Sequence, residues 1–328
     1  MAADMTAIFA ADVTLAQAQA KLAEVGQWLP MDGRPDLPLG RLAEENSTGP
    51  LRLGYGAWRD LLLGVQFTNG RGQFISAGGI TMKNVAGYDL TKFMVGQHGV
   101  FGRIVTLATR TYRRPAGAIH ATYPAATSIL EKLLPTALRP QWAMLTNAAG
   151  PGLGWHGQVR LPMPPNEITT QAAPAPPPTN NHLVLGYIGD DAALDYYERE
   201  LSSTDPATIT RQPLDADIAL RDRPWCGGPG NDANVVRVSI APSHIAAFVS
   251  AVQPAHFAAD PAFGVIRLFD TPIVRIIPLL PQFAARATSY DGRRLVNYNI
   301  SSEEQALLQR LKTAFDPDGR LTPLEFAR

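Results

Sequence analysis

Four apolar residues recur at helical spacing near the start of the chain: Leu15, Ala18, Leu22 and Val25. Positions three or four apart lie on one face of an α-helix, so this run predicts a helix over 15–25. Thr14 and Gln17 form the capping-box pattern that begins a helix, and Gly26 is typical of a residue that ends one.

Two β-rich segments follow in the first third of the chain. The segments 61–68 and 72–76 flank the turn sequence Asn69-Gly70-Arg71 and predict a β-hairpin. The run 103–112 is rich in β-branched residues and is soon followed by Pro115, which would interrupt a sheet ladder. We therefore place a domain boundary near residue 115.

Beyond residue 115 the pattern alternates between strand-like and helix-like segments. The strand-like segments are 118–123, 183–188 and 235–240, and the helix-like ones are 191–202 and 243–253. This alternation predicts an α+β second domain over 116–300, with an exposed proline-rich loop at 162–178. A last helix is predicted over 301–315, because Ser301 and Glu304 form a capping box and Pro317 follows.

The composition excludes several classes of protein. Of the 328 residues 45% are hydrophobic, which is enough for a substantial core and excludes a disordered chain. Lys and Arg number 29, as do Asp and Glu, so no net charge draws the protein to nucleic acid. The one cysteine, Cys226, can form neither an internal disulfide nor a cysteine-rich iron–sulfur or zinc site. The six histidines lack metal-site spacing, so we predict no metal site and only surface or packing roles for them.

The same features bear on the location of the protein. The longest apolar runs fall well short of the roughly 20 residues that span a bilayer. The first ten residues lack the basic region of a secretory signal. With its single cysteine, the chain is expected to be cytoplasmic and to have no membrane span.

The stretch from Ala77 to Gly102 contains six glycines around a short helical pattern. Backbone without Cβ atoms can approach a planar or phosphorylated ligand and direct N–H groups toward it. Lys83, Asn84 and Asp89 would add polar groups to such a site, at the ligand-facing edge of one compact unit. The same glycines equally fit tight turns between packed elements, so the residues alone leave both interpretations open.

The centre of this stretch resembles a known family. The string Gly79-Ile-Thr-Met-Lys-Asn-Val-Ala-Gly-Tyr-Asp-Leu90, followed by Gly96, Gly99 and Gly102-Arg-Ile-Val105, is similar to the signature of the FAD-binding subunits of bacterial glycolate oxidase. These subunits belong to the vanillyl-alcohol-oxidase-type (PCMH-type) flavoprotein superfamily. The resemblance covers most of residues 8–115 closely and 300–324 loosely, and the middle of the chain is compatible with the family's cap domain.

The resemblance implies an α+β fold with FAD as the cofactor. An N-terminally truncated PCMH-type FAD-binding domain would span 1–115, an α+β cap domain 116–300, and a helix and tail returning to the first domain 301–328. No catalytic residue is implied. The positions that match the family's flavin contacts are Gly49, Arg59, Asp60, Lys83, Asn84, Gly87, Tyr88, Asp89, Gly99, Gly102, Ile104 and Val105.

Two departures from the family predict weak FAD binding. The family's glycine-rich pyrophosphate loop has no counterpart, because the chain begins about where the second strand group is expected. Arg41, Glu44 and Glu45 stand where the family places small residues against the flavin, and their bulk and negative charge disfavour a diphosphate. Several lost charge-assisted hydrogen bonds, at about 1.5–3 kcal/mol each, would lower the affinity by two or more orders of magnitude.

The implied function is that of an FAD-dependent oxidoreductase subunit that oxidises a 2-hydroxy acid such as glycolate. The implied partners are a companion flavin subunit and an iron–sulfur subunit that receives the electrons. The alternative is a flavin-less structural or regulatory subunit that retains the fold without catalysis. A flavin chromophore in the purified protein distinguishes the two, whereas the sequence does not specify the exact substrate, the electron acceptor or the oligomeric state.

Overall fold

The computed structural model describes residues 4–79, 89–124, 128–147, 181–226, 235–269, 271–290 and 295–327. The predicted proline-rich loop lies outside these residues, and so do four of the predicted flavin contacts, Lys83, Asn84, Gly87 and Tyr88. No described helix is long and apolar enough to cross a membrane.

Within the described residues, the first part of the chain forms a four-stranded antiparallel sheet in the order β1-β5-β3-β4. Its strands are β1 (Thr6–Ala10), β3 (Leu62–Thr68), β4 (Phe74–Gly78) and β5 (Arg103–Arg110). The helices beside it are α1 (Leu15–Ala23), α2 (Leu39–Glu44), α3 (Arg52–Tyr55), α4 (Trp58–Leu61) and α5 (Leu90–Phe93). A short pair, β2 (Gln27–Trp28) and β6 (Tyr112–Arg113), leads out of this unit. We call residues 6–113 the small unit.

The inner face of the four-stranded sheet makes the core of the small unit. Phe9 and Val65 both lie opposite Leu107 in the strand register, and all three side chains are buried with Leu15 and Leu42 from the helices. The predicted capping box is confirmed, since the Thr14 hydroxyl accepts the Gln17 backbone N–H, although α1 ends two residues before Val25. Alternation of apolar and polar residues along the strands thus sets which face is buried.

The rest of the described chain forms a ten-stranded sheet in the order β10-β7-β9-β8-β12-β13-β11-β14-β15-β16. Its strands are β7 (Gly117–Pro124), β8 (Trp142–Thr146), β9 (His182–Gly189), β10 (Thr208–Pro213), β11 (Val235–Ser239), β12 (His256–Asp260), β13 (Val265–Phe269), β14 (Arg286–Tyr290), β15 (Leu295–Tyr298) and β16 (Leu324–Ala327). The helices with it are α6 (Ser128–Leu133), α7 (Asp191–Leu201), α8 (Leu214–Cys226), α9 (Ile245–Val252), α10 (Ile273–Ile276) and α11 (Ser302–Phe315). We call this part the large unit.

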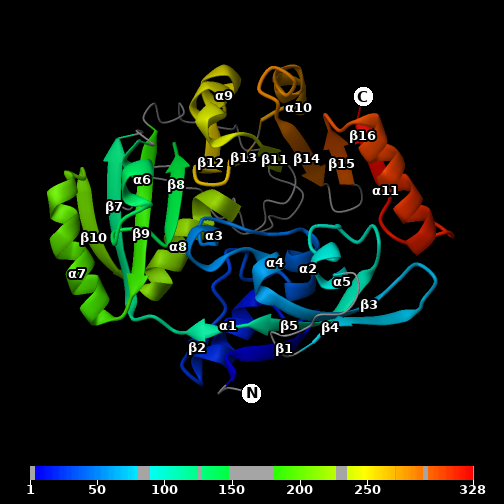
Figure 1. Cartoon of the computed structure of the whole chain (residues 1–328), viewed down its shortest axis with the longest axis horizontal. Coiled ribbons are helices and arrows are strands. Elements are labelled where there is room, and N and C mark those ends of the chain that lie inside the picture. The colour runs from blue at the N-terminus through cyan, green and yellow to red at the C-terminus, as the bar shows by residue number, and fades with distance from the viewer. Residues whose placement is uncertain are drawn as a thin grey trace, which may run out of the picture.

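The large sheet lies across the small unit, with helices α9 and α10 on the side away from it (Figure 1). One sheet face packs with α7 and α9 around Phe248 and Leu194. The other face packs with α8 and with Trp28 and Leu51 of the small unit. Because both faces are covered, Leu183–Ile188 in β9 are buried without alternation. The predicted strand 235–240 is β11, which pairs with β13 and β14 in the large sheet.

A buried charged network joins the two units. The guanidinium of Arg221 on α8 forms ion pairs with Asp32 of the small unit and, at 2.9 Å, with Asp217. Asp217 also accepts hydrogen bonds from Trp142 Nε1 at 3.0 Å and lies 2.8 Å from His120 Nε2. The two aspartates are fully buried, so the relative position of the units depends on oppositely charged groups that are shielded from water.

The last helix also contacts both parts of the molecule. Phe315 packs against Phe93 and Phe101 of the small unit, and the buried Lys312 Nζ donates hydrogen bonds to the carbonyls of Val100 and Thr322, both at 3.0 Å. Strand β16 then pairs in parallel with β15 at the edge of the large sheet. The tail therefore contacts the small unit through α11 and extends the large sheet through β16.

Candidate functional site

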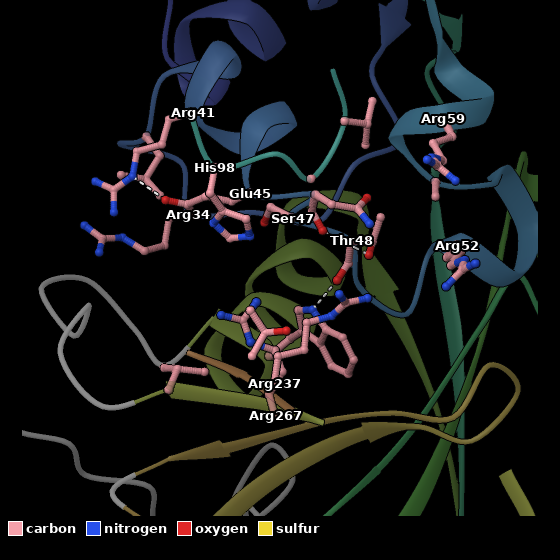
Figure 2. A pocket seen from close by; sticks show the side chains of 18 of the residues that line it. Arg34, Arg41, Glu45, Ser47, Thr48, Arg52, Arg59, His98, Arg237 and Arg267 are labelled. Atoms are coloured by element: carbon pink, nitrogen blue, oxygen red, sulfur yellow. Dashed lines mark hydrogen bonds and ion pairs between the residues drawn. The ribbon is translucent and has the colours of Figure 1, made fainter. Parts of the chain in front are cut away.

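A cavity of about 530 Å³ lies between the small unit and the large sheet. Its walls on one side come from the loops around α2 to α4 and from residues 95–98 of the small unit. On the other side they come from Trp225 of α8 and from strands β11, β13, β14 and β15. The indole N–H of Trp225 donates a 2.6 Å hydrogen bond to the Thr48 carbonyl, which holds the two walls together (Figure 2). A volume of this size is typical of a small-molecule site.

The wall of the cavity carries a large excess of positive charge. Two carboxylates line it, Glu45 and Asp60, against six arginines: Arg34, Arg41, Arg52, Arg59, Arg237 and Arg267. Two of these arginines are neutralised, since Arg34 pairs with Asp36 at 2.5 Å and Arg41 with Glu45 at 2.6 Å. The remaining positive charge favours an anionic ligand.

Arg237 and Arg267 lie directly opposite each other on the adjacent strands β11 and β13. Figure 2 shows both on one side of the cavity, with Arg34, Arg41 and His98 on the opposite side. Burial, together with the charges of Arg267 and Arg52, lowers the pKa of Arg237 to about 10, so it remains a cation at neutral pH. The Nε atom of Arg267 is buried and has no hydrogen-bond partner among the described residues.

His98 lies in the cavity wall in a left-handed conformation, with φ of 53°. Its backbone N–H donates a 2.7 Å hydrogen bond to the Glu44 carbonyl, which fixes the turn. Burial, with a contribution from Arg237, lowers the pKa of His98 to about 4, so the imidazole is neutral at pH 7. Sequence reasoning had given His98 only a surface or packing role, because nothing in the histidine spacing singles it out.

Two of the predicted flavin contacts, Arg59 and Asp60 on α4, line the cavity. The Asp60 carboxylate accepts the Ala57 backbone N–H at 2.8 Å, so part of its hydrogen-bonding capacity serves the local turn. Gly49 does not line the cavity but packs against the side chain of Asp32, where a Cβ atom would come within 2.5 Å of it. Its missing side chain therefore makes room for the interdomain network.

The other described positions lie away from the cavity wall. Asp89 caps the short helix α5 by accepting the Lys92 backbone N–H at 3.1 Å. Gly102 packs closely against Phe67, and Ile104 is buried in the core of the small unit. Val105 is exposed, and Gly99 lies beside the Arg103 guanidinium. Their contact with a flavin stays a prediction.

The structure also shows where the charged groups of Arg41, Glu44 and Glu45 lie, which the sequence predicts to disfavour a diphosphate. The Glu44 carboxylate turns away from the cavity, accepts the Ile104 backbone N–H at 2.8 Å, and lies 3.5 Å from the Arg103 guanidinium. Burial raises the pKa of Glu44 despite these interactions. Glu45 does line the cavity, but Arg41 neutralises it. Arginines therefore accompany both carboxylates, and the expectation that bulk and negative charge here disfavour a diphosphate stays a prediction.

Sequence reasoning did not single out Arg237 and Arg267. Each lies at the centre of an apolar strand, Val235-Val-Arg-Val238 and Val265-Ile-Arg-Leu268. A charged residue at such a position is the signal that points to a polar role, because a strand centre is seldom charged without cause. Among the described residues, no group of three or more His, Cys, Asp or Glu side chains could hold a metal ion.

Comparison with known proteins gives partial matches in sequence. No family model matches the chain. Glycolate oxidase subunit GlcE of Escherichia coli is 34% identical over 104 residues, which cover 31% of this chain and 30% of that protein. Glycolate oxidase subunit GlcD of Bacillus subtilis is 36% identical over 77 residues, 24% of this chain and 16% of that protein. The mitochondrial D-lactate dehydrogenase [cytochrome] of Arabidopsis thaliana is 28% identical over 100 residues, 30% of this chain and 18% of that protein. Each match thus spans less than a third of the relative.

Comparison with solved structures extends over nearly the whole chain. Two structures of alkyldihydroxyacetonephosphate synthase match 98% of this chain and 64% and 65% of theirs, with TM-scores of 0.61 and 0.62 and sequence identities of 14% and 13%. Identities this low establish the fold alone, while the sequence relatives named above are oxidases and dehydrogenases. The chain is therefore similar to glycolate oxidase subunits over about a third of its length, and it shares an α+β fold with alkyldihydroxyacetonephosphate synthase.

Proposed function

We propose that the chain is the FAD-binding subunit of an oxidoreductase that oxidises a 2-hydroxy acid such as glycolate. The observation that carries this proposal is the cavity between the two units, where Arg237 and Arg267 lack carboxylate partners among the described residues. The names of the relatives support the reaction class, since they are a glycolate oxidase and a lactate dehydrogenase. They do not favour the flavin-less alternative.

The residues of the cavity fit a part of FAD in size and its anionic groups in charge. A cavity of about 530 Å³ is large enough to enclose a substantial part of such a cofactor. Arg237 and Arg267 offer guanidinium donors to its anionic groups, and neutral His98 offers a polar group that adds no charge. When bound, FAD would supply the two-electron redox chemistry, which amino-acid side chains do not provide.

The chain's own residues would bind and orient ligands at this cavity. The two walls are joined by the Trp225–Thr48 hydrogen bond and by the buried Arg221 network, so both walls are held in place around a ligand. Arg59, which is exposed, lies at the cavity wall where it can attract an anionic substrate. Affinity of this chain for FAD is expected to be weak, because in this proposal side chains provide the phosphate contacts.

The proposed partners are a companion flavin subunit and an iron–sulfur subunit. Both glycolate oxidase relatives are named as subunits, which supports an assembly of several chains. A single cysteine cannot hold an iron–sulfur cluster. Electrons that leave this chain toward such a cluster would therefore pass to another subunit, and we propose a cytoplasmic location for the assembly.

The proposed function is tested by reduction of the loaded protein. Purified chain is saturated with FAD, made anaerobic and mixed with glycolate, D-lactate or D-2-hydroxyglutarate, with and without the companion flavin subunit. We expect the visible absorbance of the flavin to bleach with at least one of these 2-hydroxy acids. The matched control is 3-hydroxypropionate, which lacks a 2-hydroxyl group and should leave the absorbance unchanged. Absorbance that no 2-hydroxy acid bleaches, in either preparation, would contradict the proposal.

A further inference from the structure

The cavity face of the large sheet carries a continuous row of polar residues. Arg267 on β13 lies opposite Arg237 on β11, Arg237 opposite Thr288 on β14, and Thr288 opposite Asn297 on β15. All four residues line the cavity. Residues in register on adjacent strands stand on the same face of a sheet, and three strand spacings correspond to about 14 Å. The row is therefore long enough for an extended ligand.

The cationic end of the row is costly to the folded protein. Like charges directly opposite each other on neighbouring strands destabilise a sheet. No ion pair or hydrogen bond compensates Arg237 or Arg267 among the described residues, and Arg267 Nε is buried without a partner. The nearby Arg52, whose guanidinium lies over the Phe263 ring at 4.2 Å, adds a third positive charge. Such an arrangement calls for a ligand with more than one negative charge.

A phosphoryl group compensates these positive charges better than the carboxylate of a simple 2-hydroxy acid does. A phosphate monoester such as that of flavin mononucleotide carries close to two negative charges near pH 7 and has three strong acceptor oxygens, and the pyrophosphate of FAD carries two negative charges over its two phosphoryl groups. A monocarboxylate carries one charge and two oxygens, so it would leave one of the opposed guanidinium groups uncompensated. The neutral end of the row also fits such a ligand. The Thr288 hydroxyl and the Asn297 amide can donate hydrogen bonds to the hydroxyl groups of a polyol and accept them from these groups.

From this row we infer that Arg237 and Arg267 bind a phosphoryl group, and that Thr288 and Asn297 bind a hydroxyl-bearing chain attached to it. The ligand class is a phosphorylated polyol, and the ribityl phosphate half of a flavin nucleotide has this chemistry. The inference rests on the proposed function, because it names the part of the flavin that the cavity holds. In this arrangement the guanidinium groups of the large unit provide the phosphate contacts.

The test measures ligand binding by isothermal titration calorimetry with the full chain. The ligands are flavin mononucleotide, riboflavin, inorganic phosphate and oxalate, which separate the phosphoryl group from the ribityl chain and from a dicarboxylate. The variants are Arg237→Gln, Arg267→Gln and Thr288→Ala. The matched control is Arg286→Gln on the neighbouring strand β14, where the exposed arginine pairs with Glu304 at 2.9 Å outside the cavity wall. Thermal unfolding of each variant checks that it is folded.

We expect flavin mononucleotide to bind more tightly than riboflavin or oxalate, and inorganic phosphate to compete with it. Arg237→Gln and Arg267→Gln should each lower the affinity for flavin mononucleotide about 10- to 100-fold, as expected for the loss of a charge-assisted hydrogen bond. Thr288→Ala should lower it by less than about 10-fold, and Arg286→Gln should have no effect. Arg237→Gln and Arg267→Gln should each also melt at the same temperature as the unchanged protein or higher, since each removes a like-charge contact.

Other outcomes overturn the inference in recognisable ways. Oxalate binding as tight as that of flavin mononucleotide would identify a dicarboxylate site. Equal affinity for riboflavin and flavin mononucleotide would exclude a role for the phosphate, and undiminished affinity in both arginine variants would place the phosphate elsewhere. If flavin binding does not depend on the arginines while 2-hydroxy acids still bleach bound FAD, the inference fails and the proposed function stands. If the phosphoryl ligands bind as expected but no 2-hydroxy acid reduces the flavin, the inference stands and the proposed function fails.

Discussion

Replacement of Arg221 by methionine is expected to lower the free energy of unfolding by about 3–5 kcal/mol. The substitution keeps the volume of the side chain but leaves Asp32 and Asp217 as buried carboxylates without their shared cation. Asp32 would retain a hydrogen bond from the Leu51 backbone N–H, and Asp217 its contacts with Trp142 Nε1 and His120 Nε2. Such hydrogen bonds do not offset the loss of the cation that the two buried carboxylates share.

Urea denaturation followed by tryptophan fluorescence and circular dichroism measures this loss. The matched control is Arg211→Met, which removes an exposed arginine that pairs with Asp191 and Asp195, and it should change stability little. Because Asp32 belongs to the small unit and Arg221 to the large unit, we also expect Arg221→Met to weaken flavin binding at the cavity between them. A loss of stability no greater than that of the control would contradict the structural role of the network.

Replacement of Asp260 by asparagine is expected to remove a pH dependence of stability. Asp260 ends strand β12 beneath the turn that positions Phe263 under Arg52, and its carboxylate accepts the Ala262 and Phe263 backbone N–H groups. Burial raises the pKa of Asp260 to about 7, although these hydrogen bonds and the charge of Arg52 oppose the rise. In the unfolded chain the group takes its ordinary pKa of 3.8.

The sign of the effect follows from proton binding in the two states. Between about pH 4 and pH 7 the folded protein holds a proton that the unfolded chain has released, so the free energy of unfolding falls as the pH rises. Asparagine is neutral and keeps the acceptor oxygen for the turn. The variant should therefore be more stable than the unchanged protein at pH 8, by on the order of 4 kcal/mol, and the difference should vanish near pH 4.

Chemical denaturation at a series of pH values checks the expectation for Asp260. The control variant, Asp12→Asn, replaces an exposed carboxylate and should leave the pH profile of stability unchanged. Parallel profiles for Asp260→Asn and the unchanged protein, from pH 4 to pH 8, would show that Asp260 is ionised in the folded protein throughout that range.

Local sequence signals predicted many of the elements that the structure contains. The capping boxes at Thr14 and Ser301 mark the starts of α1 and α11, because each hydroxyl accepts a backbone N–H three residues on. The hairpin around residues 69–71 is also confirmed, although the positive φ falls at Gly72 and not at Gly70. Gly70 instead packs against Asp316, a contact made across most of the sequence.

Other elements carry no local signal because long-range contacts determine them. Helix α8 has no clear apolar face, since its buried positions include Asp217 and Arg221, whose partners Asp32 and His120 lie far away in the sequence. Likewise the cavity is formed by loops of the small unit and strands of the large one. The opposition of Arg237 and Arg267 depends on strand register, which the sequence of either strand alone does not define.

Titration of the purified chain with FAD, followed by flavin fluorescence, tests the central claim that the cavity between the two units is a flavin site. The account predicts weak but saturable binding, with a dissociation constant in the micromolar range or higher. It also predicts that the double substitution of Arg237 and Arg267 by glutamine weakens this binding further, while Arg286→Gln does not. Submicromolar binding that is unchanged in the double variant would contradict the account, and so would the absence of saturable binding.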